Sequence, residues 1–299
     1  MVLEALRSRW WPNSGKNLRR RIERLELHVT HACNLACESC SHYSNHNHHG
    51  DLELEEADRW MAAWNSRVEV GVFHLLGGEP TIHPQLPAFV RLVRQHWPRT
   101  LIRIRTNGFF LHRHPELLAL MARDRHISID LAIHHDSPEY RRRLQPTMEL
   151  IARWQKQYRV KIDVDRSFNN WTRRYQGFGE TMQPFEDAAP RASWEICPAR
   201  HSKQLFEGKL WKCAPLAYLK LQKAKYRLSE KWDPYLRYAP LAADCSEREL
   251  DDFLKLEDEL FCAMCSAYRR PLALPNPIRS AQANQTAMAS AERGLPLAT

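Results

Sequence analysis

Residues 30–40, with the sequence THACNLACESC, place Cys33, Cys37 and Cys40 on one short segment. This segment directly follows Arg24–Thr30, where apolar and polar residues alternate as they do in a β-strand with one buried face. Up to about residue 165, further β-type runs alternate with helical runs. Strands and helices repeated at this spacing predict a parallel sheet with helical crossovers. The three cysteines are therefore expected on a loop at the carboxyl end of the first strand.

The predicted fold is α/β, with a partial (β/α)5-6 barrel. Strands are expected at Arg24–Thr30, Val70–Leu76, Leu101–Thr106, His126–His134 and Arg159–Asp165. Helices are expected at Glu53–Ser66, Gln85–Trp97, Pro115–Arg123 and Pro138–Tyr158. Five clear strands are too few for a closed eight-stranded barrel, so an open barrel fits better.

The composition is that of an ordinary soluble globular protein, with 43% hydrophobic and 26% charged residues in 299. No apolar run approaches the ~20 residues that span a bilayer, so no membrane partner is expected. Residues 1–24 lack the apolar core and cleavage site of a secretory signal, which predicts a cytoplasmic protein. The net charge of +9 is spread along the chain. Without a dense basic block, it does not indicate nucleic-acid binding and at most favours an anionic ligand.

Cysteine usage points to metal ligation. In a reducing compartment, eight cysteines are not expected to form four disulfides, and clustered thiols at short spacing typically bind metal. Besides the first three, four cysteines form two pairs and one stands alone. The pairs are Cys197 with Cys213 and Cys262 with Cys265, and the single residue is Cys245.

The CxxxCxxC spacing of the first set suits an iron–sulfur cluster. Three thiolates can hold three irons of a [4Fe–4S] cluster and leave the fourth iron open. An open iron can chelate the amino and carboxylate groups of S-adenosylmethionine (SAM). The carboxyl ends of parallel strands are also where such folds carry their functional sites. Zinc is the alternative, with His42, His46, His48 or His49 as a fourth ligand, and this segment alone does not exclude it.

Two further motifs lie at predicted strand ends. The second strand ends in Gly77-Gly78-Glu79-Pro80, and the third ends in Thr106-Asn107-Gly108. Glycines let a backbone approach a ligand closely, and carbonyl groups together with the Glu79 carboxylate can receive an ammonium group. An ordinary Gly-Gly turn is the plain alternative.

With these three motifs in this order, the chain resembles the radical SAM superfamily. The resemblance implies a partial barrel, SAM as cosubstrate that is cleaved reductively to a 5′-deoxyadenosyl radical, and a one-electron reductant of the flavodoxin or ferredoxin type. The metal ligands it implies are Cys33, Cys37 and Cys40. The predicted cofactor-binding residues are Gly77, Gly78, Glu79, Pro80, Thr106, Asn107 and His134. Family members usually place an aromatic residue just before the third cysteine, whereas this chain has Ser39.

The second cysteine set brackets a predicted hairpin and includes a CxxC turn. The hairpin strands are expected at Lys203–Phe206 and Lys209–Lys212 around Glu207-Gly208, and a helix is expected at Ser246–Phe261 before the CxxC turn. Four thiolates can fully ligate a [4Fe–4S] cluster, or zinc in a ribbon built from the same ligands. The arrangement resembles the twitch form of the SPASM extension of radical SAM enzymes, which implies a second [4Fe–4S] cluster held by Cys197, Cys213, Cys262 and Cys265.

Four segments are expected along the chain. They are an N-terminal extension (1–23), the barrel (24–185), a twitch-like auxiliary-cluster domain (186–270) and a C-terminal tail (271–299). The tail is predicted to be a peripheral strap or partly disordered.

The predicted strands carry charge on the face opposite the apolar one. In Leu101–Arg105, for example, Ile102 and Ile104 alternate with Arg103 and Arg105. Helices should cover the apolar face, so the charged face would line the barrel cavity. A cavity with charges of both signs suits a hydrophilic substrate with hydroxyl, amino or phosphate groups. Ion pairing among these charges for packing alone is the alternative.

The leading functional hypothesis is hydrogen-atom abstraction from a polar, sugar- or aminocyclitol-like small molecule, giving epimerisation. Cys245, which belongs to neither proposed cluster, is the candidate hydrogen donor. The first alternative is a dehydrogenase that uses the second cluster as electron acceptor, and the second is a peptide-modifying enzyme acting on a ribosomal precursor. From a different class, a zinc-binding basic protein that contacts nucleic acid would explain the cysteines but not Gly77-Gly78-Glu79-Pro80.

Overall fold

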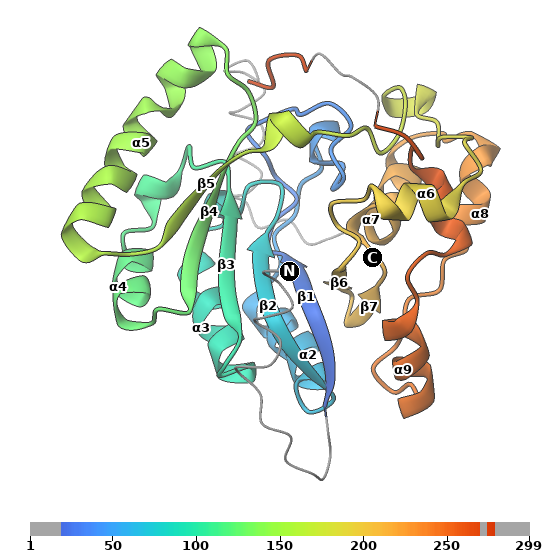
Figure 1. Ribbon diagram of the computed structural model, residues 1–299, viewed down its shortest axis with the longest axis horizontal. Coiled ribbons are helices and arrows are strands. Elements are labelled where there is room, and N and C mark those ends of the chain that lie inside the picture. The colour runs from blue at the N-terminus through green and yellow to red at the C-terminus, as the bar shows by residue number, and fades with distance from the viewer. Residues whose placement is uncertain (1–18, 270–273, 279–299) are drawn as a thin grey trace.

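Strand β1 (Arg20–His28) lies inside a seven-stranded sheet with the order β5-β4-β3-β2-β1-β6-β7 in the described part of the chain (Figure 1). The computed structural model describes residues 19–269 and 274–278. The other strands are β2 (Val68–Leu76), β3 (Leu101–Thr106), β4 (Ile127–Ile133), β5 (Ile162–Arg166), β6 (Ser202–Phe206) and β7 (Lys209–Trp211). Strands β1 to β6 pair in parallel, and β7 returns antiparallel to β6. The predicted α/β fold with an open partial barrel is confirmed.

Four helices pack on one face of the sheet and join its strands. They are α2 (Leu54–Asn65), α3 (Leu86–His96), α4 (Glu116–Arg123) and α5 (Pro138–Tyr158). The face that meets them is apolar, and Leu25, Phe73, Ile102 and Ile129 have no exposed surface there. Because side chains alternate along a strand, the polar residues of the same strands point to the opposite face. The predicted division into an apolar outer face and a polar inner face is confirmed.

The hairpin of β6 and β7 belongs to the main sheet. Strand β6 pairs with β1 over four residue pairs, from Arg24 with Ser202 to Leu27 with Leu205. All five residues of β6 are buried, which fits a strand covered on both faces. The predicted antiparallel hairpin is confirmed and joins the main sheet, while the predicted domain boundary at residue 186 stays a prediction.

The remaining helices lie beside β6 and β7 (Figure 1). They are α6 (Pro190–Glu195), α7 (Ala214–Lys225), α8 (Asp233–Leu236) and α9 (Glu247–Lys255). The helix expected at Ser246–Phe261 is wrong in its second half, because α9 ends at Lys255 and a short 3-10 helix, η7 (Leu260–Met264), follows. Lys212 holds the intervening segment: its ammonium group donates to the Glu257 carbonyl oxygen at 2.7 Å and pairs with Glu259 at 3.0 Å.

The ends of the chain are described only in part. Strand β1 begins at Arg20, so it takes in the last residues of the predicted extension, and residues 1–18 lie outside the described part. In the predicted tail, residues 274–278 cross the loop after β1, where the Ala36 amide donates to the Pro277 carbonyl oxygen at 2.7 Å. The rest of the tail lies outside the described residues. Within the described ranges, no helix is both long and apolar enough to cross a membrane.

Candidate active site

A cavity of about 550 Å³ lies at the carboxyl ends of the parallel strands, and its wall contains seven of the eight cysteines. Strand β1 ends at His28, and the loop after it carries Cys33, Cys37 and Cys40. The other four reach the same wall from segments that follow β5 in the chain, and they are Cys197, Cys213, Cys262 and Cys265. The structure thus brings both predicted cysteine sets to one cavity.

The Gly77-Gly78 turn after β2 packs directly on the backbone of the cysteine loop. The amides of Gly78 and Glu79 donate hydrogen bonds of 2.8 Å to the carbonyl oxygens of Thr30 and Ala32. A Cβ atom at Gly78 would lie 2.2 Å from the Ala32 oxygen, so a side chain there would displace the loop. The glycines therefore fix the backbone just before Cys33, whereas their close approach to a ligand stays a prediction.

The carboxylate of Glu79 ties this turn to the end of β3. It accepts hydrogen bonds from the Thr106 hydroxyl, from the Asn107 amide at 2.6 Å and from the Thr81 amide at 3.0 Å. The residue is 1% exposed, and burial raises the pKa of Glu79 although these hydrogen bonds oppose the shift. Since both carboxylate oxygens already have donors, Glu79 holds the two turns together, and its contact with a SAM ammonium group stays a prediction.

Asn107 connects the third motif to the first. Its side-chain amide donates a 2.8 Å hydrogen bond to the side-chain oxygen of Asn34, which lies between Cys33 and Cys37. The three motifs form one hydrogen-bonded unit at the edge of the sheet. Of the residues predicted to bind SAM, the cavity wall includes Gly77, Gly78, Glu79, Thr106, Asn107 and His134. Pro80 does not reach the wall, because it begins the short 3-10 helix η2 (Pro80–Ile82) behind it.

The histidines after the first cysteine set have different surroundings. Burial opposes ionisation of Cys40, but a hydrogen bond and the nearby charge of His42 lower the pKa of this thiol overall. The His46 Nε2 atom lies 3.1 Å from the Tyr175 hydroxyl, and the His46 ring stacks on Phe178. The His48 ring contacts the side-chain amide of Gln222. Two candidates for a fourth zinc ligand are therefore engaged elsewhere, while His42 favours a thiolate at Cys40.

Several elements bring the second cysteine set together. Cys197 follows α6, Cys213 is the residue before α7, and Cys262 and Cys265 lie in and just after η7. Helix α6 packs on η7, and the Ser193 hydroxyl donates a 2.9 Å hydrogen bond to the Cys265 carbonyl oxygen.

The second set has the chemistry of a metal-cluster donor set. Burial raises the pKa of Cys265 to about 12 and that of Cys213 further, and neighbouring thiols of the set add to both shifts. Thiols that are buried and oppose one another's ionisation become thiolates when a bound cation compensates their charge. In the described residues, no three His, Cys, Asp or Glu side chains are placed to hold a single metal ion. Four thiolates can ligate the separate irons of a [4Fe–4S] cluster or a single zinc ion, so the second cluster stays a prediction.

Two buried cations that sequence reasoning missed accompany the second set. Arg174 is 7% exposed and forms a hydrogen bond with Cys265. Lys212 is also 7% exposed, and its charge lowers the pKa of Cys262, although burial raises that pKa overall. Neither residue belongs to a recognisable motif, so its position could not be predicted from spacing.

Ser39 is a buried residue of the cavity wall whose hydroxyl is fully used in hydrogen bonds. It is 4% exposed, and its backbone is left-handed with φ 52°. The hydroxyl accepts hydrogen bonds from the amides of Arg174 at 2.7 Å and Tyr175 at 3.1 Å and donates one to the Tyr175 carbonyl oxygen at 3.1 Å. The departure from the usual aromatic residue is thus explained by the chain segment that docks here.

The rest of the wall carries the polar residues expected from strand alternation. Paired groups include Arg105 with Asp165 at 2.6 Å and His74 with Glu26 at 3.8 Å. His134 lies beside them, and burial together with Arg105 lowers its pKa to about 4, so its imidazole is neutral at pH 7. Farther from the cavity, Arg103 pairs with Asp130 at 3.2 Å. Some of the predicted lumen charges therefore serve packing, and others border the cavity.

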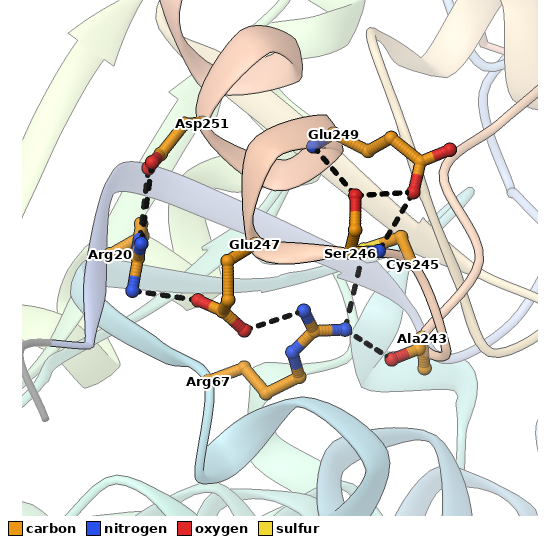
Figure 2. A network of polar contacts seen from close by, with 8 residues as sticks. All are labelled: Arg20, Arg67, Ala243, Cys245, Ser246, Glu247, Glu249 and Asp251. Carbon is orange, nitrogen blue, oxygen red and sulfur yellow. Dashed lines mark hydrogen bonds and ion pairs between the residues drawn. The ribbon is translucent and has the colours of Figure 1, made fainter.

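Cys245 lies at the other end of the sheet, in the polar network that Figure 2 shows. Its thiol accepts a 3.3 Å hydrogen bond from Arg67, the residue just before β2, and Arg67 also pairs with Glu247 at 2.8 Å. Glu247 pairs with Arg20, the first residue of β1, at 2.6 Å. Strand β2 has nine residues, so at about 3.3 Å per residue roughly 25 Å separates Arg67 from the Gly77-Gly78 turn that packs on the first cysteine loop. The expected position of Cys245 near the barrel mouth is wrong, because α9 and the turn before it run back toward the amino ends of the strands.

Comparisons with known proteins agree with the motifs. The sequence profile described as the radical SAM superfamily matches residues 27–189. GTP 3′,8-cyclase from Chlorobaculum tepidum is 29% identical over 99 residues, which make up 33% of this chain and 30% of that protein. The chain therefore matches less than a third of this relative's length.

Two solved structures match parts of the chain at low similarity. Native anSMEcpe with bound AdoMet and Cp18Cys peptide has 17% sequence identity and a TM-score of 0.37. The match covers 48% of this chain and 42% of the anSMEcpe chain. Streptococcus suis SuiB bound to precursor peptide SuiA has 11% identity and a TM-score of 0.36, covering 83% of this chain and 71% of its own. The family profile spans more than half of the chain and includes all three motifs. This protein belongs to the radical SAM superfamily.

Proposed function

We propose that this radical SAM enzyme is an oxidoreductase that removes two hydrogens from a polar substrate bound in the cavity. Family membership implies SAM and one [4Fe–4S] cluster, and we add a second cluster held by Cys197, Cys213, Cys262 and Cys265. The observation that carries the proposal is that both cysteine sets border the same cavity. When bound, the cofactors would supply a radical that takes one hydrogen atom from the substrate and an acceptor for the electron that follows.

The balance of the oxidation also requires a route for a proton. Loss of a hydrogen atom and then of one electron and one proton turns an alcohol into a carbonyl group. His134 borders the cavity and is neutral at pH 7, since burial and Arg105 lower its pKa to about 4. A neutral imidazole can accept a hydrogen bond from a substrate hydroxyl, orient it, and take up the hydroxyl proton before releasing it to water. Asp165, paired with Arg105, lies beside it as a further acceptor.

Oxidation is favoured over epimerisation by the positions of the thiols. A redox-neutral epimerisation needs a group that returns a hydrogen atom to the substrate radical. Among the described residues that line the cavity, every cysteine belongs to one of the two cluster sets. Cys245, the expected donor, is not part of this wall, and roughly 25 Å along β2 separates its partner Arg67 from the turn beside the first cysteine set.

The polarity of the wall supports a hydrophilic substrate. Arg24, Glu26, His74, Arg105 and Asp165 project from neighbouring strands toward the cavity. Arg105 already pairs with Asp165 and His74 with Glu26, and the remaining N–H groups and lone pairs of these residues can hydrogen-bond hydroxyl, amino and anionic groups of a ligand. A polyol or amino sugar is the substrate class that we propose.

A peptide is the second candidate substrate. The two solved structures named above contain peptides, although their TM-scores of 0.37 and 0.36 give the likeness no weight for this chain. Polar peptide side chains would satisfy the same wall groups. The experiment below therefore includes peptides.

The proposal is tested with anaerobically reconstituted enzyme, SAM, a one-electron reductant, and parallel panels of polyols, amino sugars and peptides. We expect a small-molecule product two hydrogens lighter than its substrate and one 5′-deoxyadenosine for each product. The Cys262→Ala variant should still form 5′-deoxyadenosine but little product. A product that is an isomer of the substrate and that gains one deuterium when the reaction runs in heavy water would contradict the proposal. If only peptides were turned over, the proposed substrate class would be wrong.

A further inference from the structure

Arg174 is a buried cation whose partners are thiols. It is 7% exposed, borders the cavity, and forms a hydrogen bond with Cys265. Cys197, Cys213 and Cys265 line the same cavity as Arg174, and the charge of these three residues raises the pKa of Arg174 against the effect of burial. Among the described residues, no carboxylate forms an ion pair with it. A guanidinium group removed from water is costly unless an anion compensates it, and the available anions are the thiolates of this set.

The backbone of Arg174 is held by the first cysteine loop. Ser39 lies one residue before Cys40, and its hydroxyl accepts a hydrogen bond of 2.7 Å from the Arg174 backbone amide. On either side, the Trp171 indole donates to the Glu38 carbonyl oxygen at 2.8 Å, and Tyr175 is bonded to the same Ser39 hydroxyl at 3.1 Å. The segment 171–175 is therefore fastened to Glu38 and Ser39, while the Arg174 side chain extends to the second cysteine set.

A fixed cation beside a cluster affects its reduction potential. Reduction adds negative charge, and a nearby positive charge or an N–H group bonded to a ligand sulfur stabilises the more negative state. Both effects raise the potential, and both are stronger where water is excluded. An acceptor with a higher potential takes an electron from the substrate more readily.

We propose that Arg174 raises the reduction potential of the second [4Fe–4S] cluster, and that Ser39 fixes Arg174 in position from the loop of the first cluster. The inference rests on the proposed function, because it requires the second cluster. It makes Ser39 a positioning residue that acts through Arg174. The loop that binds the first cluster thereby sets a property of the second.

The test measures the midpoint potential of the second cluster by spectroscopically monitored redox titration. The background is the full chain with Cys33, Cys37 and Cys40 replaced by Ala, so that one cluster gives the signal. We expect the potential to fall in the order background, Arg174→Lys, Arg174→Gln, because Lys keeps the charge but not the planar geometry. Ser39→Ala should also lower it, by less than Arg174→Gln. If Arg174→Gln loses its cluster, Arg174→Lys and Ser39→Ala decide the question.

Arg173→Gln is the matched control, since the Arg173 side chain pairs with Glu38 at 2.6 Å. Its potential should equal that of the background. Two results would overturn this inference but not the proposed function. One is an Arg174→Gln variant that keeps its cluster and has the same midpoint potential as the background. The other is an Arg173→Gln variant whose potential shifts as much as that of Arg174→Gln. When Arg174→Gln loses its cluster, unchanged potentials in both Arg174→Lys and Ser39→Ala would overturn it. A background protein that binds no iron would instead overturn the proposed second cluster, so the two failures are distinguishable.

Discussion

The Ser39 hydroxyl accepts a hydrogen bond of 2.7 Å from the backbone amide of Arg174, 135 residues further along the chain. Ser39 directly precedes Cys40, and Arg174 reaches Cys265. One serine therefore joins the loop of the first cysteine set to a buried cation of the second. This contact explains why the position before the third cysteine is small and polar.

Ser39→Ala should destabilise the protein. It leaves the buried amides of Arg174 and Tyr175 without their acceptor, and each such loss costs about 1–3 kcal/mol. Denaturant unfolding of the metal-free protein measures the effect. Ser41→Ala, where the hydroxyl contacts only the adjacent His42 ring at 3.2 Å, is the control and should change stability by less. Equal stabilities for the two variants would show that the Ser39 contacts are not important.

Glu79→Gln should weaken the unit formed by the three motifs. The carboxylate accepts hydrogen bonds from Thr81, Thr106 and Asn107, whereas an amide offers one acceptor and places an NH₂ group against a donor. We expect a loss of about 1–3 kcal/mol in unfolding free energy and weaker SAM binding, with the second cluster retained. Calorimetric titration with SAM measures the binding. Unchanged stability and unchanged SAM affinity would contradict the role given to Glu79.

Acidification should destabilise the fold through His48 and His134. Burial and Lys225 lower the pKa of His48 to about 3, and burial and Arg105 lower that of His134 to about 4. Their unfolded pKa is near 6.5, so below pH 6.5 the unfolded chain binds more protons than the folded one. Stability is therefore retained above about pH 7 and lost as the pH falls toward 4, by about 2 kcal/mol per histidine at pH 5. His48→Gln and His134→Gln should each reduce the slope of unfolding free energy against pH between 6.5 and 4.5, and an unchanged slope would refute the assignment.

Cys245→Ser should leave turnover unchanged. The thiol lies beside Arg67 at the amino ends of the strands and does not border the cavity. Arg67→Ala, by contrast, should lower the unfolding temperature, because Arg67 also bonds the Ala243 carbonyl oxygen at 2.5 Å and pairs with Glu247 (Figure 2). Loss of product in Cys245→Ser with continued formation of 5′-deoxyadenosine would restore this residue as a hydrogen donor.

Local patterns predicted much of the barrel. Helix α5 has the predicted bounds, since Ser137 caps it by accepting the Tyr140 amide and Pro138 occupies its first turn. Strand β3 also has its predicted bounds, because Ile102 and Ile104 alternate with charged residues. The cysteine spacing likewise predicted which thiols meet at the cavity.

Long-range contacts account for what could not be predicted. Helix α7 is buried around much of its circumference, so its sequence has no single apolar stripe to reveal a helix. The Arg174 position depends on docking against Ser39, and no local pattern records that pairing. The location of Cys245 depends on the direction in which α9 packs along β1, where Asp251 pairs with Arg20 at 2.9 Å. Cys245 is close in sequence to the second cysteine set, and the prediction based on this proximity placed it at the wrong end of the sheet.

The most direct test of the account is metal analysis of the variant in which Cys33, Cys37 and Cys40 are all replaced by Ala. After anaerobic reconstitution, the variant should retain about four irons per chain, with the Mössbauer spectrum of one [4Fe–4S] cluster and no cleavage of SAM. Further replacement of Cys262 by Ala should remove this iron. Stoichiometric zinc with little iron in the variant would contradict the claim that the second cysteine set holds an iron–sulfur cluster.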